Sequence, residues 1–255
     1  MFKELKKRQF LFEELVLRDF KQKYKRTALG MVWSVLSPLL TLLIMKIVFT
    51  QFFGRNTPHY TIYLFSGNLV MAYFRESTRG GMYSLTANSS IFSKVNVPKY
   101  MFVLSKNTSS LCNFCITMLV YFLFCLADGI NFGTHMFALL YPISCLLIFN
   151  IGMGLILSAM YLFFRDTRYL YDVFLTLLNY MSAIFYTVDA YPQLIQNIFM
   201  LNPMYCYIRY IRLVVINGVI PSPIHHFLCA FYAAVVVAIG AKVYRDNNHK
   251  FLYYI

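Results

Sequence analysis

Charged residues are scarce in this sequence, and acidic residues are the scarcest. Only 13% of the 255 residues are charged, and ten are Asp or Glu against 23 Lys or Arg. Soluble domains carry about 25% charged residues, so the chain lacks the usual supply for a solvated surface. Hydrophobic residues reach 59%, and several runs approach the roughly 20 apolar residues that span a bilayer as a helix. The composition excludes an ordinary soluble domain and predicts an all-α integral membrane protein.

Motifs that would let the chain perform chemistry on its own are also missing. It contains no Gly-Lys pair, which excludes a P-loop for ATP hydrolysis, and neither HExxH nor GxSxG. Cys112 and Cys115 have CxxC spacing, but no second pair or nearby His supports a metal site, so we interpret them as packing residues. We expect a chain without catalytic residues, metal or cofactor, in which the energy for any transport comes from a partner.

The basic residues follow one pattern. Nine of the 23 lie in residues 1–30, and most others fall in short segments between apolar runs. This is the positive-inside distribution of a cytoplasmic-membrane protein rather than the footprint of a nucleic-acid partner. Six apolar runs then place both termini in the cytoplasm. Glu76 is the only acidic residue well inside these runs, which argues against a proton- or sodium-coupled carrier.

We expect an N-terminal amphipathic helix followed by a single six-span domain. Residues 1–29 carry an aromatic or aliphatic side chain every fourth position among Lys and Arg, which is typical of a helix lying on an anionic leaflet. Residues 30–255 form the membrane domain, with a cytoplasmic loop at 84–104. The predicted spans are about 31–53, 61–83, 105–127, 137–164, 172–188 and 224–243.

The apolar segment between the fifth and sixth predicted spans is interrupted by prolines. They divide residues 189–222 into pieces too short to cross a bilayer. We therefore expect re-entrant outer helices here, at about 191–200 and 203–217, which enter the outer leaflet and return. Arg209 and Arg212 lie on one face of the second helix. Three roles stay open for them: outer-leaflet phosphate contacts, the lining of an exit, or simple interfacial anchors.

Five stretches follow one another along the chain in a characteristic order: LGMVWSVLSPLL, SGNLVMAYFRES, ANSSIFSKVNVPKYMFVLS, LFFRDTRYLYDVF and IFYTVDAYPQLIQNIFMLNPMYCYIRYIR. Together they resemble the membrane (permease) subunit of ABC-2-type polysaccharide exporters, the family that exports O-antigen, capsule and teichoic acid. The resemblance covers essentially the whole chain. Two positions depart from it: Met71–Phe74 stands where the family often has Trp-x-Trp-Phe, and Ser182–Ile184 replaces a frequent proline.

The resemblance implies a complete transport machine around this chain. It implies a homodimer in the bacterial cytoplasmic (inner) membrane, two separate ABC ATPase subunits that bind ATP and Mg²⁺, and a lipid-linked polysaccharide as substrate. Two alternatives stay open: an ABC-2 permease for drugs or lipids, and a non-transporting membrane scaffold for glycan assembly. A drug exporter more often carries a long exterior domain or a fused ATPase, and this sequence contains neither.

The candidate functional residues fall into three groups. The loop at 84–104 is expected to couple to the ATPase through Asn88, Ser89, Ile91, Phe92, Lys94 and Pro98. Aromatic rings stack on sugars as well as on one another, so a substrate conduit or simple packing is expected at Tyr63, Tyr73, Phe74, Tyr180 and Tyr186. Contacts to substrate phosphates or lipid headgroups are expected from Arg18, Lys25, Arg26, Arg209 and Arg212. For Lys46, Arg75 and Glu76, which are costly inside a membrane, a polar pathway and a structural salt bridge both stay open.

Overall fold

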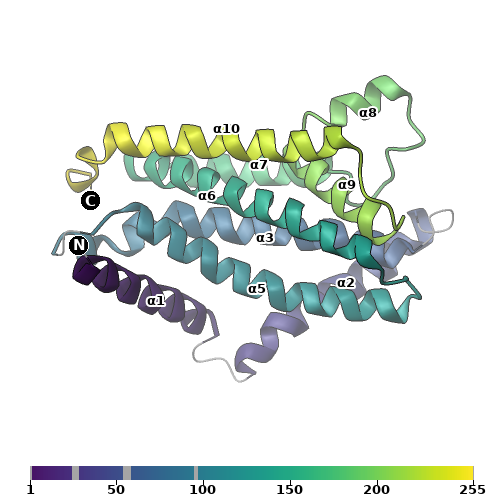
Figure 1. The fold of residues 1–255 in the computed structure, drawn as a ribbon, viewed down its shortest axis with the longest axis horizontal. Helices are drawn as coiled ribbons and strands as arrows, with labels where there is room; N and C mark the ends of the chain where they lie inside the picture. The colour runs from purple at the N-terminus through teal and green to yellow at the C-terminus, as the bar shows by residue number, and fades with distance from the viewer. Residues whose placement is uncertain (1, 25–28, 54–58, 95–96, 255) are drawn as a thin grey trace.

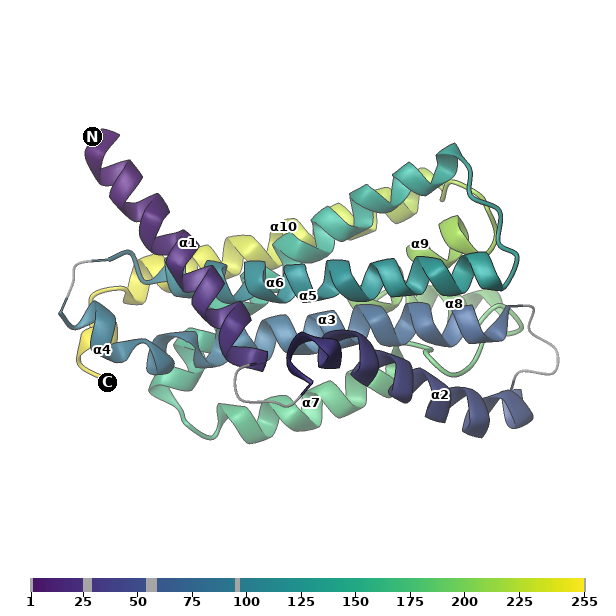
Figure 2. The same cartoon turned by 90° about the horizontal axis from the view of Figure 1, so that it is seen from below.

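The protein is a bundle of long helices that lie side by side along its longest axis (Figures 1 and 2). The computed structural model describes residues 2–24, 29–53, 59–94 and 97–254, and every regular element in these ranges is a helix. The four longest bundle helices are α3 (Tyr60–Ala87), α5 (Tyr100–Ala127), α6 (Leu140–Phe163) and α10 (Pro223–Asn247). The other elements are α1 (Phe2–Tyr24), η1 (Gly30–Val32), α2 (Trp33–Phe53), α4 (Ser89–Phe92), η3 (Thr134–Leu139), α7 (Thr167–Met181), α8 (Gln193–Phe199), α9 (Pro203–Val215) and η4 (Lys250–Leu252).

The predicted all-helical class is confirmed, whereas the number of spans stays a prediction. Three segments of the described chain are long and apolar enough to cross a membrane: Tyr100–Ala127, Thr134–Phe163 and Pro223–Asn247. A shorter apolar helix covers Trp33–Val48. Helix α3 also matches a predicted span in position, but the charges of Arg75, Glu76 and Arg79 reduce its apolar character.

The fifth predicted span differs most from the structure. Helix α7 has 15 residues and ends at Met181, seven positions before the predicted end. Ala183 follows with a left-handed φ of 49°, a conformation that L-residues seldom adopt and that stops a helix. The two short helices predicted after it exist as α8 and α9, and the Asn202 side chain caps α9 by accepting a hydrogen bond of 2.9 Å from the Met204 amide. Their re-entrant course stays a prediction.

Helices α6 and α10 approach each other closely because glycines line their contact. A Cβ added to Gly152 would lie 2.6 Å from the backbone nitrogen of Val237, and one added to Gly240 would lie 2.7 Å from the Gly152 carbonyl oxygen. Helix α3 approaches α6 in the same way at Gly81 and Gly154. Small residues are the usual means of close helix packing in membranes, where burying apolar surface gives little driving force.

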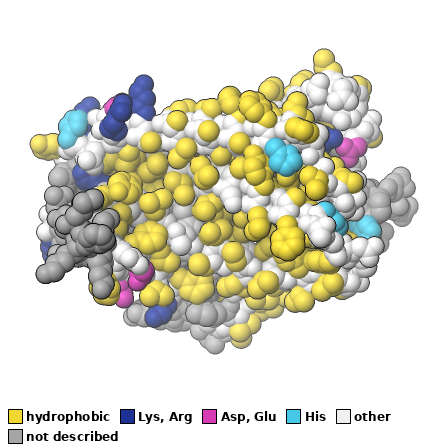
Figure 3. Space-filling model, viewed as in Figure 1, with side chains coloured by type: hydrophobic (Ala, Val, Ile, Leu, Met, Phe, Trp, Pro, Cys, Tyr) yellow, Lys and Arg dark blue, Asp and Glu magenta, His cyan; other side chains and the backbone are white. Residues whose placement is uncertain are grey.

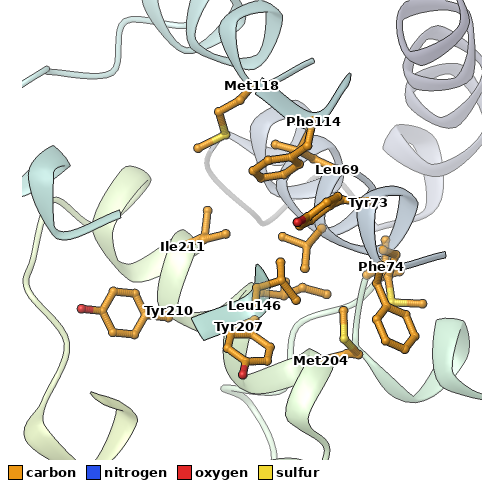
Figure 4. Packing of buried hydrophobic residues seen from close by; sticks show 14 of the residues in the cluster. Leu69, Tyr73, Phe74, Phe114, Met118, Leu146, Met204, Tyr207, Tyr210 and Ile211 are labelled. Atoms are coloured by element: carbon orange, nitrogen blue, oxygen red, sulfur yellow. The ribbon is translucent and has the colours of Figure 1, made fainter. Parts of the chain in front are cut away.

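An apolar core surrounds α3, and an apolar surface surrounds the bundle. Figure 4 shows core side chains from several helices meeting, among them Tyr73 and Phe74 of α3 and Tyr207 of α9. Hydrophobic side chains also cover most of the face seen in Figure 3, and the visible Lys and Arg lie toward its margins. A surface of this kind suits a lipid environment and not water.

Helix α1 is predicted as an interfacial helix, and that role stays a prediction. It begins away from the bundle and approaches it at its C-terminal half, as Figure 2 shows. There Leu15 is 3% exposed and packs into a cluster with residues of α5 and α6. Phe10 and Leu17 stay exposed on other faces of the helix. Helix α1 thus has one face on the bundle and apolar side chains left for a membrane surface.

Candidate functional site

A buried carboxylate fastens α1 to the bundle. The Asp19 side chain is 1% exposed and accepts hydrogen bonds from two cations, Arg18 and Lys106, at N···O distances of 2.9 Å each. Ser105 adds a longer contact of 3.5 Å to the other carboxylate oxygen. Because Lys106 and Ser105 belong to α5, this cluster joins α1 to α5 through a carboxylate that is almost completely excluded from solvent and two cations that remain partly exposed.

The same cluster reaches the predicted coupling loop. The Arg18 guanidinium donates a hydrogen bond of 2.8 Å to the side-chain oxygen of Asn88. The Asn88 side-chain nitrogen donates in turn to the Ser84 carbonyl, also at 2.8 Å. Asn88 lies where α3 ends and α4 begins, so the structure brings together Arg18, predicted as a phosphate contact, and Asn88, predicted as a coupling residue. The Arg18 side chain thus links α1 to the junction of α3 and α4.

Helix α4 is a single turn at the end of the bundle that also holds the end of α10 (Figure 2). Ile91 is half-buried against the cluster that contains Leu15, which holds the turn in place. Lys94 is exposed, while Ser89 and Pro98 are partly covered. The side chain of Phe92 lies outside the described part of the chain, as do Lys25 and Arg26. The exposed side chains described at and just after α4 are therefore Ser90, Ser93 and Lys94.

A polar groove runs between α2, α3 and α5. Its volume is about 590 Å³, and the polar residues that line it are Ser34, Ser37, Thr41, Asn68, Arg75, Glu76, Ser110, Asn113 and Thr117. Glu76 accepts a hydrogen bond of 2.7 Å from the Asn113 side chain. Tyr73 and Phe114 stack at the wall with ring centroids 4.6 Å apart. The groove therefore combines amide and hydroxyl groups, both signs of charge and aromatic rings inside an otherwise apolar bundle.

The predicted conduit aromatics do not share this groove. Only Tyr73 lines it, and its side chain is 3% exposed. Phe74 points away, toward Phe149 and a separate apolar cavity of about 510 Å³. Tyr63 and Tyr186 lie together near the outer helices, where the Tyr63 hydroxyl donates to the Tyr186 carbonyl at 2.7 Å. Tyr180 is 62% exposed on α7, so these five residues form no continuous wall in this structure.

The two arginines of α9 have different environments although they share a helix face. Arg212 is 6% exposed and donates to the carbonyl oxygens of Tyr63, Ala183 and Ile184 at 3.0, 2.9 and 3.2 Å. It lies inside the bundle, where α3 offers the Tyr63 carbonyl and the irregular backbone after α7 offers the other two. Arg209 is partly exposed beside an outer cavity of about 430 Å³ and donates to the Tyr205 hydroxyl at 2.9 Å. Both arginines line this cavity, Arg209 with the more exposed side chain, and their contact with phosphates or headgroups stays a prediction.

The other basic residues predicted inside spans have different environments. Arg75 donates a long hydrogen bond of 3.4 Å to Asn179 of α7, and Arg79 pairs with Asp172 of α7 at 2.6 Å. Lys46 is exposed on α2. The described residues contain no group of three or more His, Cys, Asp or Glu side chains that could hold a metal ion.

Sequence reasoning missed two residues whose side chains make buried polar contacts between helices. Asp19 is the clearest example, and its position carried a signal: it follows Leu15 by four residues, so it lies on the face of α1 that packs. An acid on a packing face needs a buried cation as partner. Lys106 could have been proposed for that role. Asn113, which fixes Glu76, carried no comparable signal.

Comparisons with known proteins support one family. Residues 11–216 match the family model for the ABC-2 type transporter. The chain is 27% identical over 249 residues to an O-antigen export system permease protein of Klebsiella pneumoniae, with 95% of each chain covered. It is 24% identical to another O-antigen export system permease protein from Myxococcus xanthus, over 98% of this chain and 97% of that one. It is also 24% identical to a polysialic acid transport protein of Escherichia coli, over 94% of each chain. Because the family model covers most of its length, this chain belongs to the ABC-2 type transporter family.

Proposed function

We propose that this chain is the transmembrane subunit of an ABC exporter that moves a lipid-linked polysaccharide across the bacterial cytoplasmic membrane. O-antigen, capsule and teichoic acid are the substrate class. Similar proteins over nearly their full length carry names of O-antigen and polysialic acid export. The chain is a multi-pass membrane protein and not an enzyme. A homodimer with both termini in the cytoplasm would form the conduit, and two partner ATPases would bind the ATP and Mg²⁺.

The observation that carries this proposal is the polar groove between α2, α3 and α5. A drug or lipid would favour an apolar path, whereas a glycan needs hydroxyl and amide partners with aromatic surfaces that let it slide. The groove offers both kinds of group, in Asn68 and Thr117 and in the stacked pair Tyr73 and Phe114. It also holds one charge of each sign, from Arg75 and Glu76, so that ionic as well as neutral groups of a glycan would find a partner there.

The second part of the proposal concerns how the ATPase would drive movement of this chain. ATP binding and hydrolysis in the partner would move α4, and the Arg18–Asn88 hydrogen bond of 2.8 Å would carry that movement to α1. The Asp19–Lys106 pair would carry it on to α5, one of the helices that line the groove. The contact surface proposed for the ATPase is the exposed side of α4 with Lys94.

Filling the groove tests this function. Ala72 is exposed at the groove wall, and Ala72→Trp would occupy the space that a sugar needs. We expect the cell-surface polysaccharide, measured by immunoblot of the native strain, to fall at least about tenfold, because one indole fills a large part of a sugar-sized volume. The lipid-linked glycan would accumulate inside the cell.

The matched control is Ala238→Trp, which adds the same side chain to an exposed position of α10 away from the groove. We expect it to export normally. Both variants should accumulate in the membrane at the wild-type amount, which excludes misfolding as the cause. Normal export by Ala72→Trp at wild-type abundance would contradict the proposal that glycan passes through this groove.

A further inference from the structure

A further cavity lies at the end of the bundle that holds α4 and the end of α10, outside the export path described above. It has a volume of about 400 Å³ and lies where the start of α5 meets α6 and the end of α10. Lys99, Arg245 and Asn248 supply its polar atoms, and Leu104, Leu155 and Tyr244 line the rest. We call it the Lys99 cavity. It is separate from the polar groove, with which it shares no lining residue.

The cation of this cavity is buried without an acid beside it. Lys99 is 9% exposed, and its ammonium donates to the backbone and side-chain oxygens of Asn248, both of them neutral. The Phe251 ring centroid lies 5.6 Å from the ammonium. No Asp or Glu of the described chain forms an ion pair with Lys99. A buried charge without a counter-ion is costly, and one of the three N–H groups of the ammonium is left for an acceptor.

A second cation stands at the rim. The Arg245 side chain is 83% exposed, and among the residues that the structure describes it forms a loose ion pair of 3.6 Å with the neighbouring Asp246. Burial lowers the pKa of the Lys99 ammonium from its ordinary value. An anion placed between the two cations would raise this pKa again by stabilising the charged ammonium. The remaining lining is mostly apolar and comes from α5, α6 and α10, so the cavity places two cations beside an apolar wall.

We propose that the Lys99 cavity binds an anionic glycerophospholipid, with the headgroup phosphate at Lys99 and Arg245 and an acyl chain along the slot formed with Leu104 and Leu155. Basic pockets between membrane helices on the cytoplasmic side hold anionic headgroups in this way. The site rests on the proposed function only through the orientation of the chain, which puts this end at the cytoplasmic leaflet. Lys99 directly follows the coupling loop residue Pro98, so the bound lipid would steady the base of that loop.

Lipid binding to the delipidated, purified chain tests the site without export or ATPase. The probes are dioleoyl phosphatidylglycerol, dioleoyl phosphatidylcholine and inorganic phosphate, and native mass spectrometry measures the affinity. We expect phosphatidylglycerol to bind at least about fivefold more tightly than phosphatidylcholine, and Arg245→Gln and Lys99→Gln each to weaken it by about fivefold. Leu104→Trp would weaken it by filling the slot without changing the charge.

Lys94→Gln is the charge-matched control, because Lys94 is an exposed lysine of the same loop that does not line the cavity. If Lys99→Gln disturbs folding through its Asn248 contacts, Arg245→Gln and Leu104→Trp still decide the matter, since the Arg245 head is exposed. Equal affinity for both lipids, or equal effects of Arg245→Gln and Lys94→Gln, would overturn the proposal. Binding of inorganic phosphate as tight as that of phosphatidylglycerol would overturn the lipid assignment.

Discussion

Replacing Arg212 by Met is expected to unfold the outer part of the bundle and to abolish export. Arg212 fastens the irregular segment after α7 by donating to the carbonyls of Ala183 and Ile184. These carbonyls lie outside regular helix, and each buried polar group left unpaired costs about 1–3 kcal/mol. The Tyr63 ring, whose centroid lies 3.4 Å from the Arg212 guanidinium carbon, would lose its cation as well.

Thermal unfolding of the detergent-solubilised chain measures this effect. We expect the Tm of Arg212→Met to fall by roughly 5–15 °C. Gly67→Ala should act in the same direction, because an added Cβ would lie 2.8 Å from the Arg212 side chain. Arg209→Met is the matched control, since Arg209 stands one turn away on the same helix and is partly exposed. A Tm for Arg212→Met equal to that of Arg209→Met would show that the hydrogen bonds of Arg212 do not stabilise the fold.

Replacing Asp19 by Ala is expected to release α1 and to uncouple the transporter. The substitution leaves Lys106 and Arg18 side by side without the carboxylate between them. Hydrogen bonds to charged groups contribute about 1.5–3 kcal/mol each, so amide hydrogen exchange in the second half of α1 should accelerate at least about tenfold. Surface polysaccharide should fall while the protein stays in the membrane.

Two further variants distinguish the effect of losing the Asp19–Lys106 ion pair from the effect of removing any acidic residue of α1. Glu13→Ala removes an acid from an exposed position of the same helix, and we expect it to leave exchange and export unchanged. The double variant Asp19→Ala with Lys106→Met removes both partners and should recover part of the lost stability, because an apolar pair can replace a buried ion pair. Unchanged exchange in Asp19→Ala would mean that packing through Leu15 alone holds α1.

The helices were largely predictable from the sequence because long apolar runs and prolines determine them locally. Tyr100–Ala127 and Pro223–Asn247 follow directly from the apolar content of their residues. Pro203 predicted the start of α9, since proline suits the first helical position. The end of α7 was not predictable. It depends on Arg212, 29 positions later in the chain, which donates to the Ala183 carbonyl and holds a left-handed residue in place.

The site was predictable in kind and less so in detail. The loop around Asn88 was predicted from its polar residues, but its link to Arg18 is a contact across 70 positions that no local pattern reveals. The aromatic residues were the hardest to assign. Tyr73 and Phe74 are neighbours in sequence, yet they lie about 100° apart around a helix, so one faces the polar groove and the other an apolar cavity.

Co-purification of a partner ATPase tests the central claim most directly. The chain would be extracted from its native membrane with a mild detergent. ATPase activity and associated proteins would be measured for wild type and for an α4 variant, Ser90→Glu, Ser93→Glu, Lys94→Glu, which changes exposed residues in and just after α4. An Asn131→Glu, Thr134→Glu variant between α5 and α6 serves as the control. We predict a stoichiometric P-loop ATPase with wild type and the control that is lost with the α4 variant. Absence of any ATPase from the wild-type preparation would contradict the exporter and favour a membrane scaffold.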